Sequence, residues 1–438
     1  MKHHILCGFI AAAVLVTGIP AYASQTADET VVQTEAQEEI KENTQEGMVR
    51  GFVRRLYEIV LGRPADEKGL EEWTANLLNG TEQGAKVAQG FIDSPEFKAK
   101  NLSDTEYLQV LYRTCLNREG DAPGMAQWQA VLDSGMSRLW VFKGFVESDE
   151  FTQICQSYGI ERGNAQLTAP MDMNENVTKF VVRCYRLCLG RDADTDGLNA
   201  WCSQLLGGAN TAKEAAYGFV FSTEFQHSGI PDEEFVKVMY ELFLDRQWDD
   251  EGLDNWVNIL QNNSRYYVFN GFADSAEFDQ LCQSYGLQAR TSAEKELDSY
   301  VMQVLGQITN ESMPQEQKLR ACYDWLMQQC SYKAVFGSVP DGYTFEQWYA
   351  INMFKERRGN CYSYASALLA MAKRIGYEDA VMIKGYFQGP TGKVTNTWSP
   401  HAWVEIGGLK YDPQQAAEHG YDCFGNPNSP VPYKYPDA

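Results

Sequence analysis

The pattern of hydrophobic positions changes after Leu287, where the helical repeats end, and the period of two that is typical of strands begins at residue 379. Before Leu287, segments such as FVRRLYEIVLGR (52–63) place apolar residues three and four positions apart, which is typical of amphipathic helices. After it, 291–310 and 313–334 are still helical in pattern, and 344–360 leads into the next segment. The pattern then predicts one more helix over 361–377, followed by three strands over 379–387, 401–406 and 409–413.

The predicted helix 361–377 has one apolar face and ends at Gly376. That face carries Ala365, Leu368, Leu369 and Ala372. The strands alternate apolar residues at Val381 and Ile383 and again at Val404 and Ile406. A helix followed by three strands indicates an α+β layer arrangement. The predicted fold class is therefore multidomain, with all-α helical repeats in two duplicated pairs followed by an α+β domain.

The helical part consists of a unit of two repeats that is itself duplicated. Four segments share the frame Arg, two residues, Asp, two residues, Gly, an apolar residue, two residues, Trp: GRPADEKGLEEW (62–73), NREGDAPGMAQW (117–128), GRDADTDGLNAW (190–201) and DRQWDDEGLDNW (245–256). Each is followed by a Gly-Phe pair and then a Glu-Phe pair. CQSYGI at 155 and CQSYGL at 282 repeat the same register. We expect one repeat pair over 49–160, a linker over 161–175 and a second pair over 176–290.

The repeated residues have a structural interpretation and two functional alternatives. The repeated Asp lies where a helix N-cap is expected, the Arg can pair with it, and the Trp suits a core position. The Trp and Phe side chains could instead form sugar-binding platforms. DADTDG (192–197) matches the start of a calcium-binding EF-hand loop, but the twelfth position, which requires a bidentate Glu, is Ser203. The sequence favours the structural interpretation, with no metal or cofactor.

These repeats resemble a bacterial family of unknown function found in exported proteins, itself reminiscent of phycobilisome linker domains. The resemblance covers roughly 49–287 and rests on the shared frame. It implies a helical interaction module that docks the protein to a cell-wall or surface partner.

Three residues of the α+β part suit thiol chemistry. Cys361 lies at the start of a predicted helix, where the dipole and free N–H groups favour a thiolate. His401 opens the second predicted strand and Asp412 ends the third. An activated thiol needs a base beside it and a third group that orients the base. The other histidines beyond the N-terminal segment, His227 and His419, lack a comparable strand context.

The motifs around these residues are similar to those of the transglutaminase-like superfamily, which shares its Cys-His-Asp arrangement with papain-type peptidases. They are GNCYSYA (359–365), HAWV (401–404) and YDP (411–413). The resemblance assigns 294–438 to a catalytic domain, with Cys361 as nucleophile, His401 as general base and acid, and Asp412 as orienting carboxylate. It implies attack on an amide of a protein or peptide, a thioester, and release to water or to an amine. The backbone N–H of Cys361 is one expected oxyanion donor, and Gln347 and Trp348 lie in the preceding segment.

Two alternatives stay open at this point. Besides Cys7, the chain has ten cysteines, which could form five disulfides that include Cys361, or a metal site. The four repeats together are also longer than the enzyme domain. The protein could therefore be a non-catalytic surface-binding protein with a degenerate transglutaminase-like domain.

The N-terminus and the net charge concern location and partners. Residues 1–23 combine Lys2, an apolar run too short to span a bilayer and the cleavage pattern Ala21-Tyr22-Ala23, which predicts a signal peptide. Residues 24–48 are acidic and contain no aromatic residue, which is typical of a disordered spacer. We expect an exported bacterial protein, extracellular or at the cell surface, without a membrane span after cleavage. A net charge of −22 argues against nucleic acid as a partner.

Overall fold

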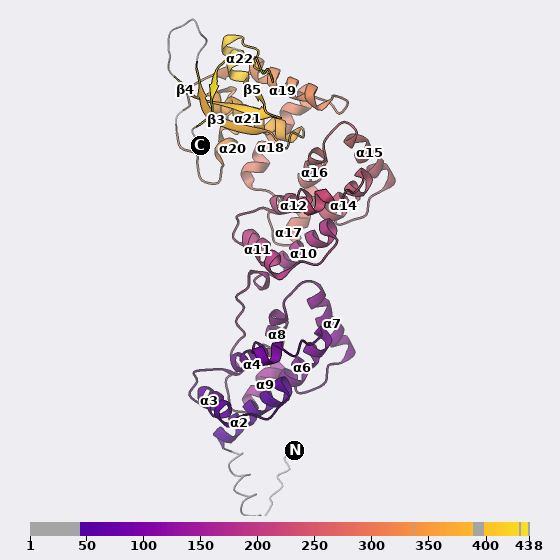
Figure 1. Cartoon of the computed structure of the whole chain (residues 1–438), viewed down its shortest axis with the longest axis vertical. Helices are drawn as coiled ribbons and strands as arrows, with labels where there is room; N and C mark the ends of the chain where they lie inside the picture. Colours follow the sequence, from indigo (N-terminus) through magenta and orange to yellow (C-terminus); the bar gives the residue numbers. More distant parts are fainter. Residues whose placement is uncertain (1–43, 336, 389–397, 429–430, 437–438) are drawn as a thin grey trace, which may run out of the picture. The chain divides into compact units, whose positions relative to one another are not determined.

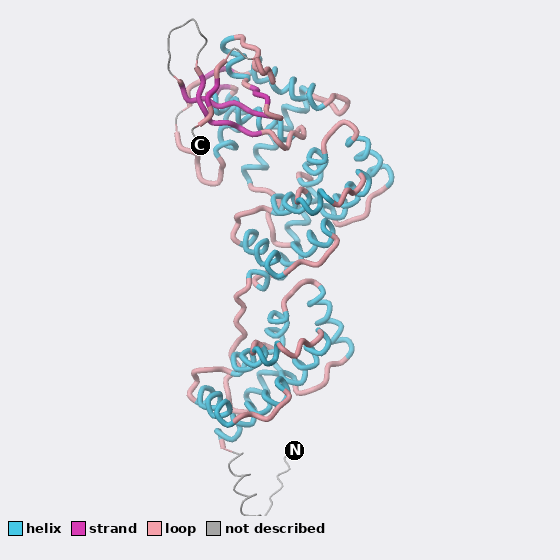
Figure 2. The backbone as a smooth tube through the Cα atoms, in the orientation of Figure 1, coloured by secondary structure: helices cyan, strands magenta, loops and turns pink. Residues whose placement is uncertain are grey.

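The computed structural model describes residues 44–335, 337–388, 398–428 and 431–436. The predicted signal peptide and most of the predicted spacer lie outside these residues. The spacer was expected to reach residue 48, but helix α2 (Gln45–Leu56) begins earlier, because Thr44 caps it by accepting the N–H of Gly47. The described residues form two compact units: 44–126 with 142–166, and 127–141 with the described residues from 167 onward. Strands occur in the C-terminal part of the described chain, as Figure 2 shows.

The described part of the repeats is built from short helices. The first two repeats contain α2, a π-helical turn η1 (Tyr57–Leu61), α3 (Glu67–Leu78), α4 (Gly84–Ile92), α5 (Pro95–Lys98), α6 (Asp104–Leu116), α7 (Ala122–Asp133), α8 (Arg138–Val146) and α9 (Asp149–Ser157). After the turn η2 (Pro170–Asp172), the next two contain α10 (Glu175–Leu189), α11 (Thr195–Leu206), α12 (Ala212–Val220), α13 (Thr223–His227), α14 (Asp232–Leu244), α15 (Asp250–Leu260), α16 (Arg265–Ala273) and α17 (Ala276–Ser284). Figure 1 shows these helices in sequence order, and the prediction of helical repeats is confirmed.

The repeated frame joins two successive helices in the same way each time. In the first repeat, Asp66 caps α3 by accepting the N–H of Gly69 at 2.9 Å. Arg63 pairs with Asp66 at 3.5 Å and with Glu96 at 2.7 Å, and its guanidinium lies 5.0 Å from the centre of the Tyr57 ring. The other repeats place Arg118 over Tyr112, Arg191 over Tyr185 and Arg246 over Tyr240, at 5.0–5.1 Å. The frame is thus a cap with an exposed ion pair, as the structural interpretation predicted.

The repeated glycine and tryptophan have steric reasons. A Cβ at Gly197 would lie 2.1 Å from the hydroxyl of Tyr185, so only glycine lets the two helices approach this closely. Trp201 covers Gly218, where a Cβ would lie 2.5 Å from the indole, and its ring lies 5.0 Å from that of Phe219. The tryptophans were expected in the core, but they are half-buried, and Trp73, Trp201 and Trp256 each lie over a glycine of the next helix.

Substituting Gly197 tests this packing. We expect Gly197→Ala to lower stability by about 1–3 kcal/mol, because the added methyl group overpacks the buried Tyr185. Gly306→Ala is the matched control: it lies within a helix of the same unit, and its Cβ would meet no atom within 4 Å. Alanine there should raise stability by roughly 0.5–1 kcal/mol. Calorimetric unfolding of both variants measures the difference, and equal transition temperatures would contradict the steric argument.

The C-terminal domain packs helices on one sheet. Its elements are α18 (Ser292–Ile308), α19 (Gln315–Gln329), β1 (Ser331–Tyr332), α20 (Phe345–Glu356), β2 (Arg358–Gly359), α21 (Cys361–Arg374), β3 (Val381–Phe387), β4 (Ser399–Ile406), β5 (Leu409–Tyr411), α22 (Pro413–His419) and β6 (Tyr433–Lys434). The sheet order is β5-β4-β3-β6, all antiparallel. Helix α21 is the centre of the core: its Ala365, Leu368 and Ala372 are buried in one cluster with Val404 and Ile406 of β4. The predicted α+β domain is confirmed.

Two residues that the sequence pattern placed among the apolar core positions, Val381 and Leu369, are not fully buried in the structure. Val381 is 48% exposed, because it pairs with Glu405, and it is the next residue, Met382, that pairs with the buried Val404 and shares its face. Leu369 is half-buried and lines a cavity of about 260 Å³ on the far side of α21.

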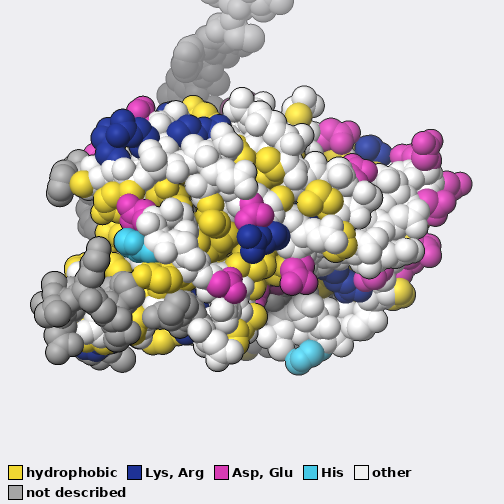
Figure 3. Space-filling view, turned by 90° about the horizontal axis from the view of Figure 1, so that it is seen from above, with side chains coloured by type: hydrophobic (Ala, Val, Ile, Leu, Met, Phe, Trp, Pro, Cys, Tyr) yellow, Lys and Arg dark blue, Asp and Glu magenta, His cyan; other side chains and the backbone are white. Residues whose placement is uncertain are grey.

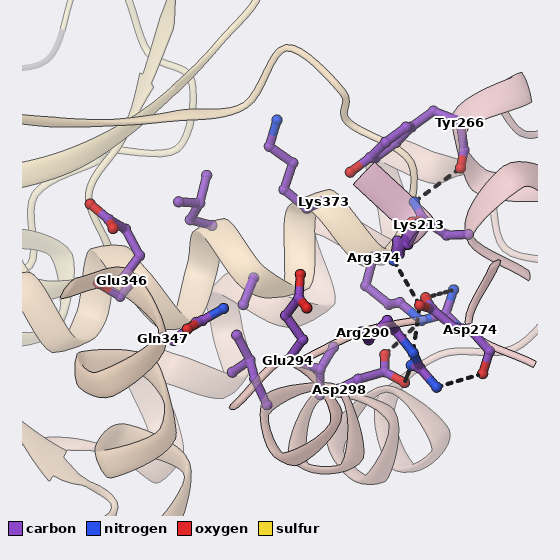
Figure 4. Close-up of a pocket in the computed structure, with 16 residues that line it drawn as sticks. Lys213, Tyr266, Asp274, Arg290, Glu294, Asp298, Glu346, Gln347, Lys373 and Arg374 are labelled. Carbon is purple, nitrogen blue, oxygen red and sulfur yellow. Dashed lines mark hydrogen bonds and ion pairs between the residues drawn. The ribbon is translucent and has the colours of Figure 1, made fainter. Parts of the chain in front are cut away.

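A buried charge network joins the fourth repeat to the C-terminal domain within the larger unit. Arg290 is 8% exposed and contacts Asp274 at 3.1 Å, Asp298 of α18 at 3.3 Å and Asp279 at 3.4 Å. Arg374, at the end of α21, pairs with Asp298 at 3.2 Å. Figure 4 shows Arg290 and Arg374 pointing toward Asp274 and Asp298 beside the same cavity. The C-terminal domain is thereby attached to the second repeat pair by charge pairing.

Charged side chains on the surface are unevenly distributed. Figure 3 shows acidic side chains gathered at one edge of the face that it draws, and hydrophobic side chains among a few lysines and arginines on the other side. Within the described residues, no helix has the length and apolar character needed to cross a membrane.

Candidate active site

The first turn of α21 positions Cys361. Asn360 is the N-cap, and its side chain accepts the N–H of Ser363 at 3.2 Å. The segment just before the cap is fixed by a short parallel pairing of β1 with β2, in which Lys333 donates its N–H to the carbonyl of Gly359 at 2.8 Å. A Cβ at Gly359 would lie 2.3 Å from Cβ of Ser363, so the turn into the helix requires glycine. Cys361 is 9% exposed and is a free thiol.

The imidazole of His401 and the carboxylate of Asp412 form a buried pair. Nε2 of His401 lies 2.6 Å from Oδ2 of Asp412, and each residue is 1% exposed. His401 is the third residue of β4, so the strand begins two residues before the predicted start. Asp412 follows β5 directly and caps α22. Adjacent antiparallel strands therefore bring together two residues that the sequence separates by a turn.

The ring of His401 also interacts with the thiol of Cys361. Because Nε2 is bonded to Asp412, Nδ1 is the ring nitrogen left for a hydrogen bond with Cys361. Burial by itself would lower the pKa of His401, but the charge and hydrogen bond of Asp412 and the contact with Cys361 raise it to about 9. The protonated ring is therefore favoured at neutral pH, which is the form that stabilises a neighbouring thiolate. The ring of His401 thus interacts with both Cys361 and Asp412, and we call these three residues the row.

The carboxylate of Asp412 is held from several directions. Its Oδ1 accepts the N–H of Gln415 at 3.1 Å, and its Oδ2 also accepts the hydroxyl of Tyr433 at 2.9 Å. Its backbone carbonyl accepts the hydroxyl of Tyr323 at 2.9 Å. Sequence reasoning missed Tyr433 and Tyr323. The alternation of Val431 and Tyr433 is the one signal that could have indicated a strand there, and it is too short to be specific.

The structure gives other roles to several candidate residues. Gln347 belongs to a capping box at the start of α20, where its side-chain oxygen accepts the N–H of Thr344 at 2.9 Å, and Trp348 packs on Tyr343 with ring centres 5.7 Å apart. Asp194 caps α11 and Asp192 bonds Arg186 at 2.8 Å, which are structural roles for the DADTDG carboxylates. All ten cysteines of the described chain are free thiols, so their even number does not indicate five disulfides.

Comparison with known families agrees with this division of the chain. The model described as "Domain of unknown function (DUF4214)" matches residues 27–101, 88–155, 166–229 and 216–282, and the model of the transglutaminase-like superfamily matches 302–413. The matches do not extend to phycobilisome linker domains. A search of curated proteins found no match. Since the four DUF4214 matches cover more than half of the 438 residues, the chain belongs to the DUF4214 family, and its C-terminal domain is a member of the transglutaminase-like superfamily.

Proposed function

We propose that the protein is an exported, thiol-dependent acyl-transfer enzyme that acts on amides of proteins or peptides. The observation that carries the proposal is the buried row of Cys361, His401 and Asp412, with the free thiol at a helix N-terminus and a 2.6 Å contact between ring and carboxylate. The match to the transglutaminase-like superfamily supports cysteine-based chemistry in general. Cys361, His401 and Asp412 are the residues that would perform this chemistry.

The first half of the reaction forms a thioester. The thiolate of Cys361 attacks the amide carbonyl carbon, a C–S bond forms, and the carbonyl electrons move onto oxygen. The N–H of Cys361 is outside the helical hydrogen-bond ladder, because it is in the first turn, and is free to bind that oxyanion. The imidazolium of His401 then gives its proton to the leaving nitrogen, the C–N bond breaks, and the amine departs. Asp412 keeps the ring in the required orientation throughout.

The second half releases the acyl group. His401, now neutral, removes a proton from water or from a primary amine, which attacks the thioester carbonyl. The C–S bond breaks and the thiolate–imidazolium pair is restored. Water as acceptor gives hydrolysis, and an amine gives a new amide bond. The same three residues serve both outcomes.

The repeats supply the docking function in this proposal. They form helical units whose chemically distinctive residues, such as Arg63 and Asp66, are used for caps and pairing within each repeat. Such helical arrays present loops to a partner. We therefore propose that the repeats hold the enzyme at a cell-wall or surface partner after export, near its protein or peptide substrate.

The nucleophile is tested by comparing the wild type with Cys361→Ser. Two assays cover both acceptors: release of new N-termini from a peptide mixture, and incorporation of a biotinylated primary amine into protein glutamine. We expect the wild type to be active in at least one assay and the variant to lose about 10³-fold or more, because a serine hydroxyl is a far weaker nucleophile here.

The matched control is Cys330→Ser, which changes a half-buried cysteine of the same domain and should retain activity. If the wild type and Cys361→Ser behave alike in both assays while both bind whole cells, the non-catalytic surface-binding function is the correct one and the proposal is wrong.

A further inference from the structure

The C-terminal strand β6 contributes a side chain to the Asp412 carboxylate. β6 pairs with the edge of β3, with Tyr433 opposite Phe387 and Lys434 opposite Tyr386. The hydroxyl of Tyr433 then lies 2.9 Å from Oδ2 of Asp412, the same oxygen that contacts His401. A segment far along the chain from Cys361 therefore reaches the third member of the row.

The local packing brings β6 this close. A Cβ at Gly385 of β3 would lie 2.5 Å from the carbonyl oxygen of Lys434 and 2.7 Å from the indole of Trp403. Glycine at this position therefore admits both the strand and the indole. The Tyr433 ring packs on Trp403, with centres 4.7 Å apart, and lies nearly parallel to the ring of His401, at 22° and 6.3 Å. The position of the hydroxyl is thus set by a packed ring.

The hydroxyl of Tyr433 stabilises the negative charge of the Asp412 carboxylate. Asp412 is 1% exposed, and a buried carboxylate depends on hydrogen bonds from the protein to stabilise its charge and hold its direction. A carboxylate turned away from His401 would support the protonated ring less, and a neutral ring stabilises a neighbouring thiolate less. The titratable groups around the pair are Cys361 on α21, Tyr433 on β6, Tyr323 on α19 and Cys423. Of these, Tyr433 donates directly to the oxygen that His401 uses.

We propose that Tyr433 is a positioning residue that holds the Asp412 carboxylate directed at His401, and so supports the protonated ring that activates the Cys361 thiol. The proposal rests on the proposed function, since it concerns the same three residues. It adds a fourth side chain, from the C-terminal strand, that acts through Asp412 and does not touch the substrate.

The test measures how fast iodoacetamide alkylates Cys361 as a function of pH, with mass spectrometry to identify the site and without any substrate. In the wild type we expect fast alkylation that continues below pH 7, where an ordinary thiol reacts slowly. In Tyr433→Phe, which removes only the hydroxyl, the acid limb of the profile should move up by about one pH unit. At pH 6 this shift corresponds to a roughly tenfold slower reaction.

The matched control is Tyr435→Phe, whose hydroxyl bonds Glu405 and has no contact with the row. Its profile should coincide with that of the wild type. A purely structural role for Tyr433 would lower the unfolding temperature and leave the acid limb in place, which would overturn the proposal. If the wild type itself reacts like an ordinary thiol, the proposed function fails instead, so the two failures are distinguishable.

Discussion

Replacing Asp412 with asparagine is expected to slow acyl transfer by a factor of about 10³–10⁴. The carboxylate contacts Nε2 of His401 at 2.6 Å and, by its charge and this hydrogen bond, raises the pKa of the ring. Asparagine has nearly the same shape but no charge, and its amide can present N–H to the ring. The ring then loses both its orientation and the stabilisation of its protonated form.

The pH dependence of turnover should change in a defined direction. In the wild type, activity should fall as the pH rises past about 9, because His401 then loses the proton that it gives to the leaving amine. In Asp412→Asn that alkaline limb should move down toward about 6.5, the ordinary value for histidine. Turnover is measured in the peptide-release or amine-incorporation assay across this range.

Asp422→Asn is the control, because Asp422 is an exposed carboxylate of the same segment that accepts from Asn426 at 3.1 Å. It should leave both the rate and the alkaline limb unchanged. A loss of less than tenfold in Asp412→Asn, with the limb still near pH 9, would show that Asp412 does not hold the ring.

Removal of Arg290 is expected to have the largest effect on stability. Arg290→Met keeps much of the side-chain volume but leaves Asp274, which is buried with a side chain 6% exposed, without its nearest guanidinium. Asp298 also loses a partner, and burial together with repulsion from Asp274 already raises the pKa of that carboxyl. Breaking a buried ion pair from one side costs about 3–5 kcal/mol. Lys213 stays 2.7 Å from Asp274 and Arg374 stays 3.2 Å from Asp298, so we expect a loss at the lower end of this range.

Calorimetry measures this loss as a shift of the unfolding transition of the larger unit. A cost of about 3–5 kcal/mol should lower the transition by roughly 5–8 °C in a unit of this size. Lys179→Met removes an exposed helical pair with Glu175 in the same unit and should cost less than about 1 kcal/mol. A transition within 2 °C of the wild type for Arg290→Met would show that Lys213 and Arg374 compensate both carboxylates without it.

The elements with long, regular patterns were predictable from the sequence. The helix over 361–377 was expected from its apolar face, and α21 spans Cys361–Arg374. The strand expected over 379–387 is β3, Val381–Phe387. The repeated Asp was expected to cap a helix, and Asp66, Asp194 and Asp249 do so. Helix and strand periods and N-caps are local properties, so they can be recognised without knowing what packs against them.

The short and the charged elements were not predictable. β6 has two residues and β1 has two, which is too few for a period to be recognised. The pairing of Arg290 with Asp274 and Asp298 depends on helices that meet only after folding. The even number of cysteines indicated disulfides, but pairing needs thiols that meet, and the ten described cysteines are free.

The sequence by itself determined the four helical repeats, the α+β domain after them, and the candidates Cys361, His401 and Asp412. These follow from periodicity, from repeated spacing and from motifs, all of which are carried by residues close together in the chain. The tertiary structure decided that Asp412 meets the ring of His401 at 2.6 Å, that Tyr433 donates to the same oxygen, and that Arg290 attaches the domain to the fourth repeat. Each of these contacts joins residues on different elements, and only the packing of strands and helices sets the distance between them.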